Sequence, residues 1–85
     1  MMAKEYPYTD EDKRMYNMRY NKDVGYYLLR KRTQLGLSLR TVSKNTGIGR
    51  STISRIENNE IVPHWNTLIS LLNFYHDVQL GFRLV

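Results

Sequence analysis

Six polar side chains cluster within residues 50–58, and the chemistry that they offer is hydrogen bonding. These are Arg50, Ser51, Thr52, Ser54, Arg55 and Asn58. On a helix they face away from Ile53, Ile56 and Glu57, which follow the i, i+3, i+4 spacing of a buried stripe. The outer face carries donors and acceptors but no acid, which suits a helix lying in the major groove of duplex DNA. The sequence therefore predicts a helix over residues 50–58 that contacts DNA.

The preceding residues fit the first helix and the turn of a helix-turn-helix. Val42 and Ser43 place an apolar and a small residue side by side, where the first helix must touch the second. Gly47 tolerates the positive φ that the turn needs, and Ile48 can fill the space beneath it. Apolar stripes and a glycine at a helix end occur in any small helical protein, but here they agree in one register over about twenty residues. We expect the first helix of this motif at residues 39–45.

The charge distribution agrees with a surface that follows phosphates. The 85 residues carry a net charge of +5, and residues 1–23 contain equal numbers of basic and acidic side chains. Residues 24–56 contain no acid and seven basic residues, namely Arg30, Lys31, Arg32, Arg40, Lys44, Arg50 and Arg55. An ordinary solvated basic face is the alternative. A membrane surface fits less well, because these residues are spread over three predicted helices and none has a large apolar face opposite its lysines.

Several other classes of protein are disfavoured. Without cysteine the chain has no disulfide, thiolate chemistry or zinc finger, and it lacks both a membrane-spanning apolar run and a signal peptide. His64 and His76 have no neighbouring carboxylates that would complete a metal or acid–base site, and no nucleotide-binding glycine motif is present. We expect a cytoplasmic protein with no catalytic residues, no metal, no cofactor and no membrane partner.

An arginine lies on an apolar stripe of the helix predicted over residues 24–35. The stripe consists of Val24, Leu28, Arg32 and Leu35. A lone buried charge is costly, so Arg32 should have a carboxylate partner, and Glu57 is the acid on the inner stripe of the helix over residues 50–58. We therefore predict a buried Arg32–Glu57 ion pair. The alternative is that both side chains reach solvent independently.

The two ends of the chain carry their own signals. Thr9 can cap a helix over residues 10–20, whose acidic start and basic end match the helix dipole, and this arm either packs on the domain or is loosely attached. After Pro63, apolar residues from Trp65 to Tyr75 recur at helical spacing. In residues 77–85, Val78, Leu80, Phe82 and Leu84 alternate with other residues, as in a strand. A lone strand needs a partner, so we expect it to pair across a homodimer; a frayed terminus is the alternative.

Residues 24–75 resemble the Cro and phage-repressor type of helix-turn-helix family, often called the XRE family. The resemblance rests on Arg32, on Gly36-Leu37-Ser38, on Gly47, and on residues 49–59, GRSTISRIENN, where the family commonly has a sequence like SRSTISRIENG. It implies an all-α, lambda-repressor-like domain with a five-helix core that binds duplex DNA as a homodimer and regulates transcription. Repression is favoured, and activation stays open as the alternative. We place the N-terminal arm at residues 1–22, this domain at 23–76 and the dimerisation strand at 77–85.

The resemblance also implies which residues touch DNA. Base contacts fall on Arg50, Ser51, Thr52 and Arg55. Phosphate contacts fall on Ser38, Arg40, Lys44, Ser54 and Asn58. The second helix commonly begins with a glutamine that contacts phosphate, and Leu39 stands there instead, so Ser38, Arg40 or Lys44 would have to substitute for it.

Two other functions stay open at this point. The C-terminal residues look like the end of antitoxin members of the family, in which a terminal strand builds an intersubunit sheet, so a toxin protein is a possible partner. A protein-interaction module that does not bind DNA is the second alternative.

Overall fold

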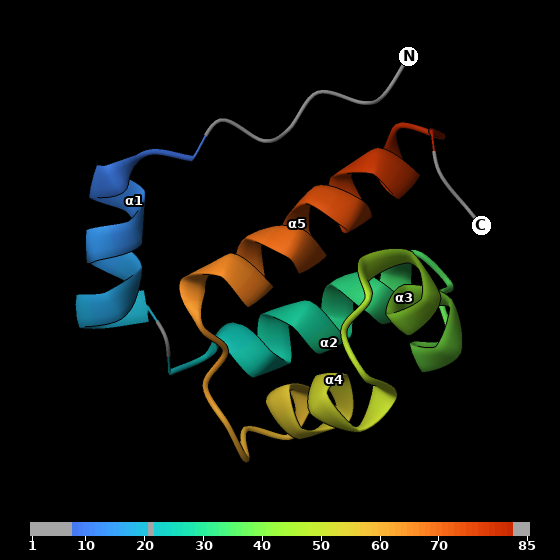
Figure 1. Ribbon diagram of the computed structural model, residues 1–85, viewed down its shortest axis with the longest axis horizontal. Coiled ribbons are helices and arrows are strands. Elements are labelled where there is room, and N and C mark those ends of the chain that lie inside the picture. The colour runs from blue at the N-terminus through green and yellow to red at the C-terminus, as the bar shows by residue number, and fades with distance from the viewer. Residues whose placement is uncertain (1–7, 21, 83–85) are drawn as a thin grey trace.

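The computed structural model describes residues 8–20 and 22–82, and these residues contain helices and no strand. Five α-helices occur in this part of the chain (Figure 1): α1 Asp10–Met15, α2 Val24–Gln34, α3 Leu39–Thr46, α4 Arg50–Glu57 and α5 Trp65–Gln79. The helices predicted over residues 24–35, 39–45 and 50–58 are therefore confirmed to within one residue at each end. The helix predicted over residues 10–20 is divided into α1 and a π-helical stretch, Tyr16–Tyr20. No described helix is both long enough and apolar enough to cross a membrane.

Local sequence signals explain where these helices begin and end. The Thr9 side chain accepts a hydrogen bond from the backbone N–H of Asp12, and the Asp12 carboxylate accepts one from the Thr9 N–H, so the two form a capping box. At α3, the Ser38 hydroxyl accepts from the N–H of Thr41 at 3.1 Å. Gly47 ends α3 with a φ of 78°, the left-handed conformation that glycine adopts without steric cost.

Helix α2 lies at the centre of the arrangement, between α5 and α4, and α1 stands at one end of α2 and α5 (Figure 1). A close approach at Gly25 brings α2 against the end of α4. A Cβ atom added to this glycine would overlap the carbonyl oxygen of Ile56 and approach the Asn59 side chain. Only a residue without a side chain therefore lets α2 and α4 pack at this separation, a requirement that the sequence analysis missed.

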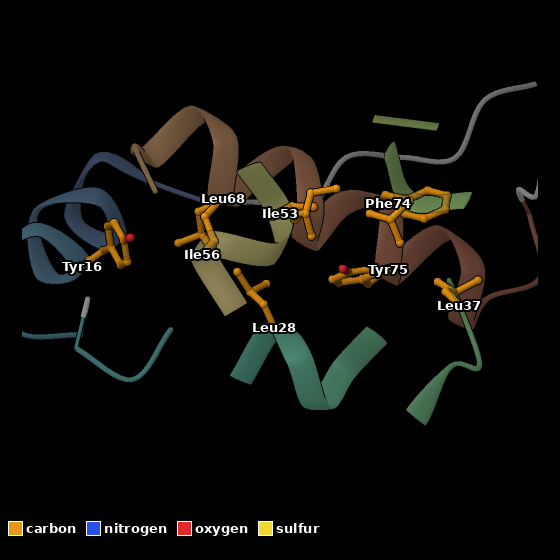
Figure 2. Packing of buried hydrophobic residues seen from close by; sticks show 10 residues of the cluster. Tyr16, Leu28, Leu37, Ile53, Ile56, Leu68, Phe74 and Tyr75 are labelled. Carbon is orange, nitrogen blue, oxygen red and sulfur yellow. The ribbon is translucent and has the colours of Figure 1, made fainter. Parts of the chain in front are cut away.

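One cluster of ten buried residues joins the π-helical stretch to helices α2 to α5 (Figure 2). Its members are Tyr16, Leu28, Leu37, Val42, Ile53, Ile56, Leu68, Leu71, Phe74 and Tyr75. Figure 2 shows Tyr16 at one end of the cluster and Leu37 and Phe74 at the other. Tyr16 comes from the N-terminal arm, and its hydroxyl donates a hydrogen bond to the Pro63 carbonyl oxygen at 2.8 Å. Tyr16 thus attaches the arm to the domain, whereas α1 itself contributes no buried residue.

The prediction of a C-terminal strand is wrong for the described residues. Val78 lies in the last turn of α5, Leu80 caps the helix and Phe82 follows the cap, whereas Leu84 lies outside the described residues. Val78 is spaced three and seven residues from Tyr75 and Leu71, so it also fits the buried stripe of α5, where it packs on the core. A helix satisfies its own backbone groups, whereas a strand here would need a partner.

Gly81, predicted as part of the strand, instead ends α5. Its φ is 81°, its N–H donates to the Val78 carbonyl, and the N–H of Phe82 donates to the Asp77 carbonyl at 2.8 Å. This is the Schellman pattern of a helix end. The likeness to antitoxins depended on the strand, and it has no support in this part of the chain. The described residues contain five α-helices, and four of them, α2 to α5, lie within residues 24–79.

Candidate nucleic-acid interface

The turn between α3 and α4 is held by short hydrogen bonds. The N–H of Gly47 donates to the Ser43 carbonyl oxygen at 2.9 Å. The Thr46 hydroxyl donates to the Val42 carbonyl at 2.8 Å and accepts from the N–H of Ile48 at 3.2 Å. Ile48 is half-buried and packs on the core, in the position predicted for it. These contacts fix the direction in which α4 leaves the turn.

Helix α4 has a buried face and an exposed face. Ile53 and Ile56 are each 1% exposed, and Glu57 is buried beside them. On the other side, Arg50, Ser51, Arg55 and Asn58 are exposed, while Thr52 and Ser54 are half-buried. The helix therefore presents guanidinium, hydroxyl and amide groups to solvent and no carboxylate of its own.

The buried face of α4 is tied to α2 by the Arg32–Glu57 ion pair. Arg32 Nε donates to Glu57 Oε2 at 2.7 Å, and Arg32 Nη2 donates to Glu57 Oε1 at 2.9 Å, so the pair is bidentate. The side chains are 15% and 5% exposed. Arg32 Nη1 also donates to the Leu37 carbonyl oxygen at 2.8 Å, so the same guanidinium also holds the α2–α3 loop. The hydrogen bond to Glu57 raises the pKa of Arg32 above its ordinary value, against the opposing effect of desolvation.

Tyr75 of α5 lies close enough to this pair for both charges to act on it. Its side chain is 1% exposed, and its hydroxyl has no hydrogen-bond partner among the described residues. Burial raises the pKa of Tyr75; the negative charge of Glu57 adds to this effect and Arg32 opposes it. A buried hydroxyl without a partner costs free energy. Tyr75 lies at the end of the helical apolar spacing seen in the sequence, but that spacing gives no sign of an unpaired hydroxyl.

The predicted phosphate-contacting residues on α3 and at its N-cap differ in whether their polar groups are already hydrogen-bonded. Arg40 and Lys44 are exposed. The Ser38 hydroxyl accepts from the N–H of Thr41 and donates to Thr41 Oγ1 at 3.0 Å, so it is already engaged as the cap. Leu39 packs on the core, so an apolar residue at this position contributes to core packing. Arg40 and Lys44 are thus the exposed basic side chains of α3.

An acidic neighbour of the exposed face was missed by the sequence analysis. Glu60 Oε1 lies 3.6 Å from Arg55 Nε, and the two side chains are 56% and 61% exposed. Asn59, with a φ of 61°, reverses the chain after α4 so that Glu60 comes back toward the last turn. The N–H of Glu60 donates to the Arg55 carbonyl at 2.8 Å. A left-handed asparagine after a helix could have signalled this return.

Comparison with known families agrees with this geometry. Residues 28–82 match the model of a helix-turn-helix family of the XRE type, which is more than half of the chain. The chain belongs to the XRE-type helix-turn-helix family. The match begins on α2 and runs past the end of α5, so it includes the whole α3–turn–α4 unit. No curated protein and no solved structure matches significantly.

Membership of the XRE-type family makes the chain a domain that binds double-stranded DNA and regulates transcription. Domains of this family are typically not enzymes. In the described part of the chain, no three histidine, aspartate or glutamate side chains come together as metal ligands. The exposed face of α4 is therefore the candidate surface for contacts to bases.

Proposed function

We propose that the protein is a sequence-specific repressor that places α4 in the major groove of its operator. The observation that carries the proposal is the division of α4 into two faces. The buried face is fixed by the core and by the Arg32–Glu57 pair, and the outer face presents donors and acceptors without an acid of its own. A rigid helix that displays such groups matches the donor and acceptor pattern of base edges.

The proposed contacts divide according to reach and chemistry. Arg50, Ser51, Thr52 and Arg55 contact bases, and an arginine can make two parallel hydrogen bonds to a guanine. Ser38, Arg40, Lys44, Ser54 and Asn58 contact phosphates. Among these, Arg40 and Lys44 supply charge, whereas Ser38 would bind phosphate only by exchanging its present hydrogen bond to Thr41. Phosphate contacts set affinity and position, and base contacts set sequence preference.

The length of α4 favours binding as a homodimer. Eight helical residues span about 12 Å, which corresponds to about four base pairs of duplex. Contacts to so few base pairs give little discrimination between DNA sequences, whereas two copies on a palindrome double the number of base pairs that are contacted. We propose that two α4 helices lie about 34 Å apart, in successive major grooves. A compact domain bound across a promoter blocks other proteins from the same DNA, which is why we favour repression.

A binding selection of the purified protein on a random duplex library, repeated at two salt concentrations, tests the proposal. We expect enrichment of a palindrome whose half-sites are about one helical turn apart. A reporter gene with that palindrome across its promoter should then be repressed. Weak binding that disappears at the higher salt concentration, with no enriched sequence, would leave only general charge attraction and would overturn the proposal.

A further inference from the structure

A cleft lies on the side of the molecule formed by α1, the π-helical stretch, the start of α2 and α5. It has a volume of about 510 Å³, within the usual range for small-molecule sites. Its walls are mostly apolar, with Met15, Val24, Leu68 and Leu72 among them. No residue of α3 or α4 lines it.

Aromatic rings make up much of the cleft wall. Trp65 is central, because Tyr8 meets it edge-on at 5.8 Å between ring centroids and Tyr16 packs on it at 5.7 Å. Tyr27 of α2 adds a fourth ring and is 52% exposed. The hydrogen bond from Tyr16 to the Pro63 carbonyl fixes one of these rings in place. Faces of such rings attract cations as well as apolar groups.

Among the described side chains, the charged groups that line the cleft are both acidic. They are Asp12 and Asp23, and no described lysine or arginine side chain lines it. Asp12 already accepts the N–H of Thr9. Asp23 stands at the N-terminus of α2 but makes no capping hydrogen bond, and it forms no salt bridge with a described residue. Its exposed carboxylate is therefore available to a ligand. The acidic character is confined to the cleft itself, because Arg30 lines a neighbouring pocket together with Asp23 and Tyr27.

We infer that the cleft binds a small amphipathic organic cation, with an aromatic or alkyl body and one positive charge. The apolar wall and the rings would take the body, and Asp23 would pair with the charge at the rim. The positive charge of the ligand distinguishes this site from the proposed DNA surface, which attracts anions. The inference does not depend on DNA binding and can be tested without DNA.

Two ions of the same shape and opposite charge provide the test, tetraphenylphosphonium and tetraphenylborate. Calorimetric titration gives the affinity, and the emission of Trp65, the one tryptophan in the chain, reports whether the ion enters the cleft. We expect saturable binding of the phosphonium with a change in Trp65 emission, and at least tenfold weaker binding of the borate. General attraction to a protein of positive net charge would give the opposite order.

Two pairs of variants locate the site. Asp23→Asn should weaken phosphonium binding by about three- to tenfold, the effect of one charge close to the ligand in a mostly aqueous setting. Tyr27→Ala should weaken it by about two- to fivefold through the lost ring. The controls are Asp10→Asn and Tyr26→Ala, since both residues are exposed and neither lines the cleft. Equal binding of the two ions, no saturation, or equal losses in the controls would overturn the inference.

Discussion

Replacing Tyr75 with phenylalanine should make the protein more stable. The Tyr75 side chain is fully packed, and its hydroxyl has no partner among the described residues. Desolvating an unpaired hydroxyl costs about 1–3 kcal/mol, and phenylalanine has the same shape without that group. We expect the free energy of unfolding to rise by about 1 kcal/mol, or the melting temperature by about 4–8 °C in a domain of this size. Thermal unfolding followed by circular dichroism measures the change.

The same substitution at Tyr16 should have the opposite sign. The Tyr16 hydroxyl donates to the Pro63 carbonyl at 2.8 Å, and the ring is 5% exposed. Tyr16→Phe removes this hydrogen bond to the Pro63 carbonyl oxygen, which is worth about 0.5–1.5 kcal/mol. The chemical change is identical in the two variants, so general effects of a Tyr→Phe exchange cancel in the comparison. If both variants lowered stability equally, the reasoning from hydroxyl pairing would be refuted.

The raised pKa values of Tyr75 and Tyr16 also predict how stability depends on pH. Burial raises the pKa of Tyr75 in the folded protein, whereas the unfolded chain titrates near the ordinary tyrosine value of about 10. The stability that Tyr75 contributes through this shift is therefore fully present below pH ~10. It is lost as the pH rises further, because the unfolded state loses its proton first. For one such group the slope approaches about 1.4 kcal/mol per pH unit. Tyr75→Phe should reduce this alkaline slope, and an unchanged slope would contradict the assignment. Part of the slope should remain, because burial also raises the pKa of Tyr16.

Three further predictions concern the ion pair, the DNA contacts and the helix crossing. Glu57→Ala leaves a buried arginine unpaired and should cost about 3–5 kcal/mol in a denaturant titration, whereas Glu60→Ala, from an exposed pair, should cost less than about 0.5 kcal/mol. Equal effects of the two would mean that burial does not matter. Arg50→Ala should lower the ratio of operator affinity to random-duplex affinity. Lys44→Ala should weaken binding to the operator and to random duplex about equally and flatten the salt dependence. Equal loss on the two DNAs for each variant would refute these roles. Gly25→Ala should destabilise the protein by about 1–3 kcal/mol despite the better helix propensity of alanine, because the added methyl overlaps an α4 carbonyl oxygen; a melting temperature equal to that of the parent would contradict this.

Features with a local cause could be predicted from the sequence. The caps at Thr9 and Ser38 depend on residues three positions away, and the end of α3 depends on one glycine. The Arg32–Glu57 pair joins residues distant in sequence, yet it followed from a local anomaly, an arginine on an apolar stripe. The exposed face of α4 followed from the same helical periodicity as its buried face.

Features that depend on tertiary packing could not be predicted in this way. Nothing near Tyr16 shows that its hydroxyl meets the Pro63 carbonyl, and nothing near Gly25 shows that another backbone passes beside it. The end of α5 illustrates a second limit. Over a few residues, one apolar residue can fit both the alternation of a strand and the stripe of a helix, as Val78 does. Gly81 likewise suits a helix end as well as a break in a strand.

The two faces of α4 have a consequence for how this domain can evolve. The groups proposed to select the operator, Arg50, Ser51 and Arg55, are exposed, whereas the residues that hold the helix in place are buried on its opposite side. Exchanges at exposed helix positions usually change stability by no more than about 0.5 kcal/mol. New operator preferences can therefore accumulate on a scaffold whose stability hardly changes. By the same reasoning, grafting another outer face onto α4 while keeping Ile53, Ile56 and Glu57 should redirect the domain to a different DNA sequence.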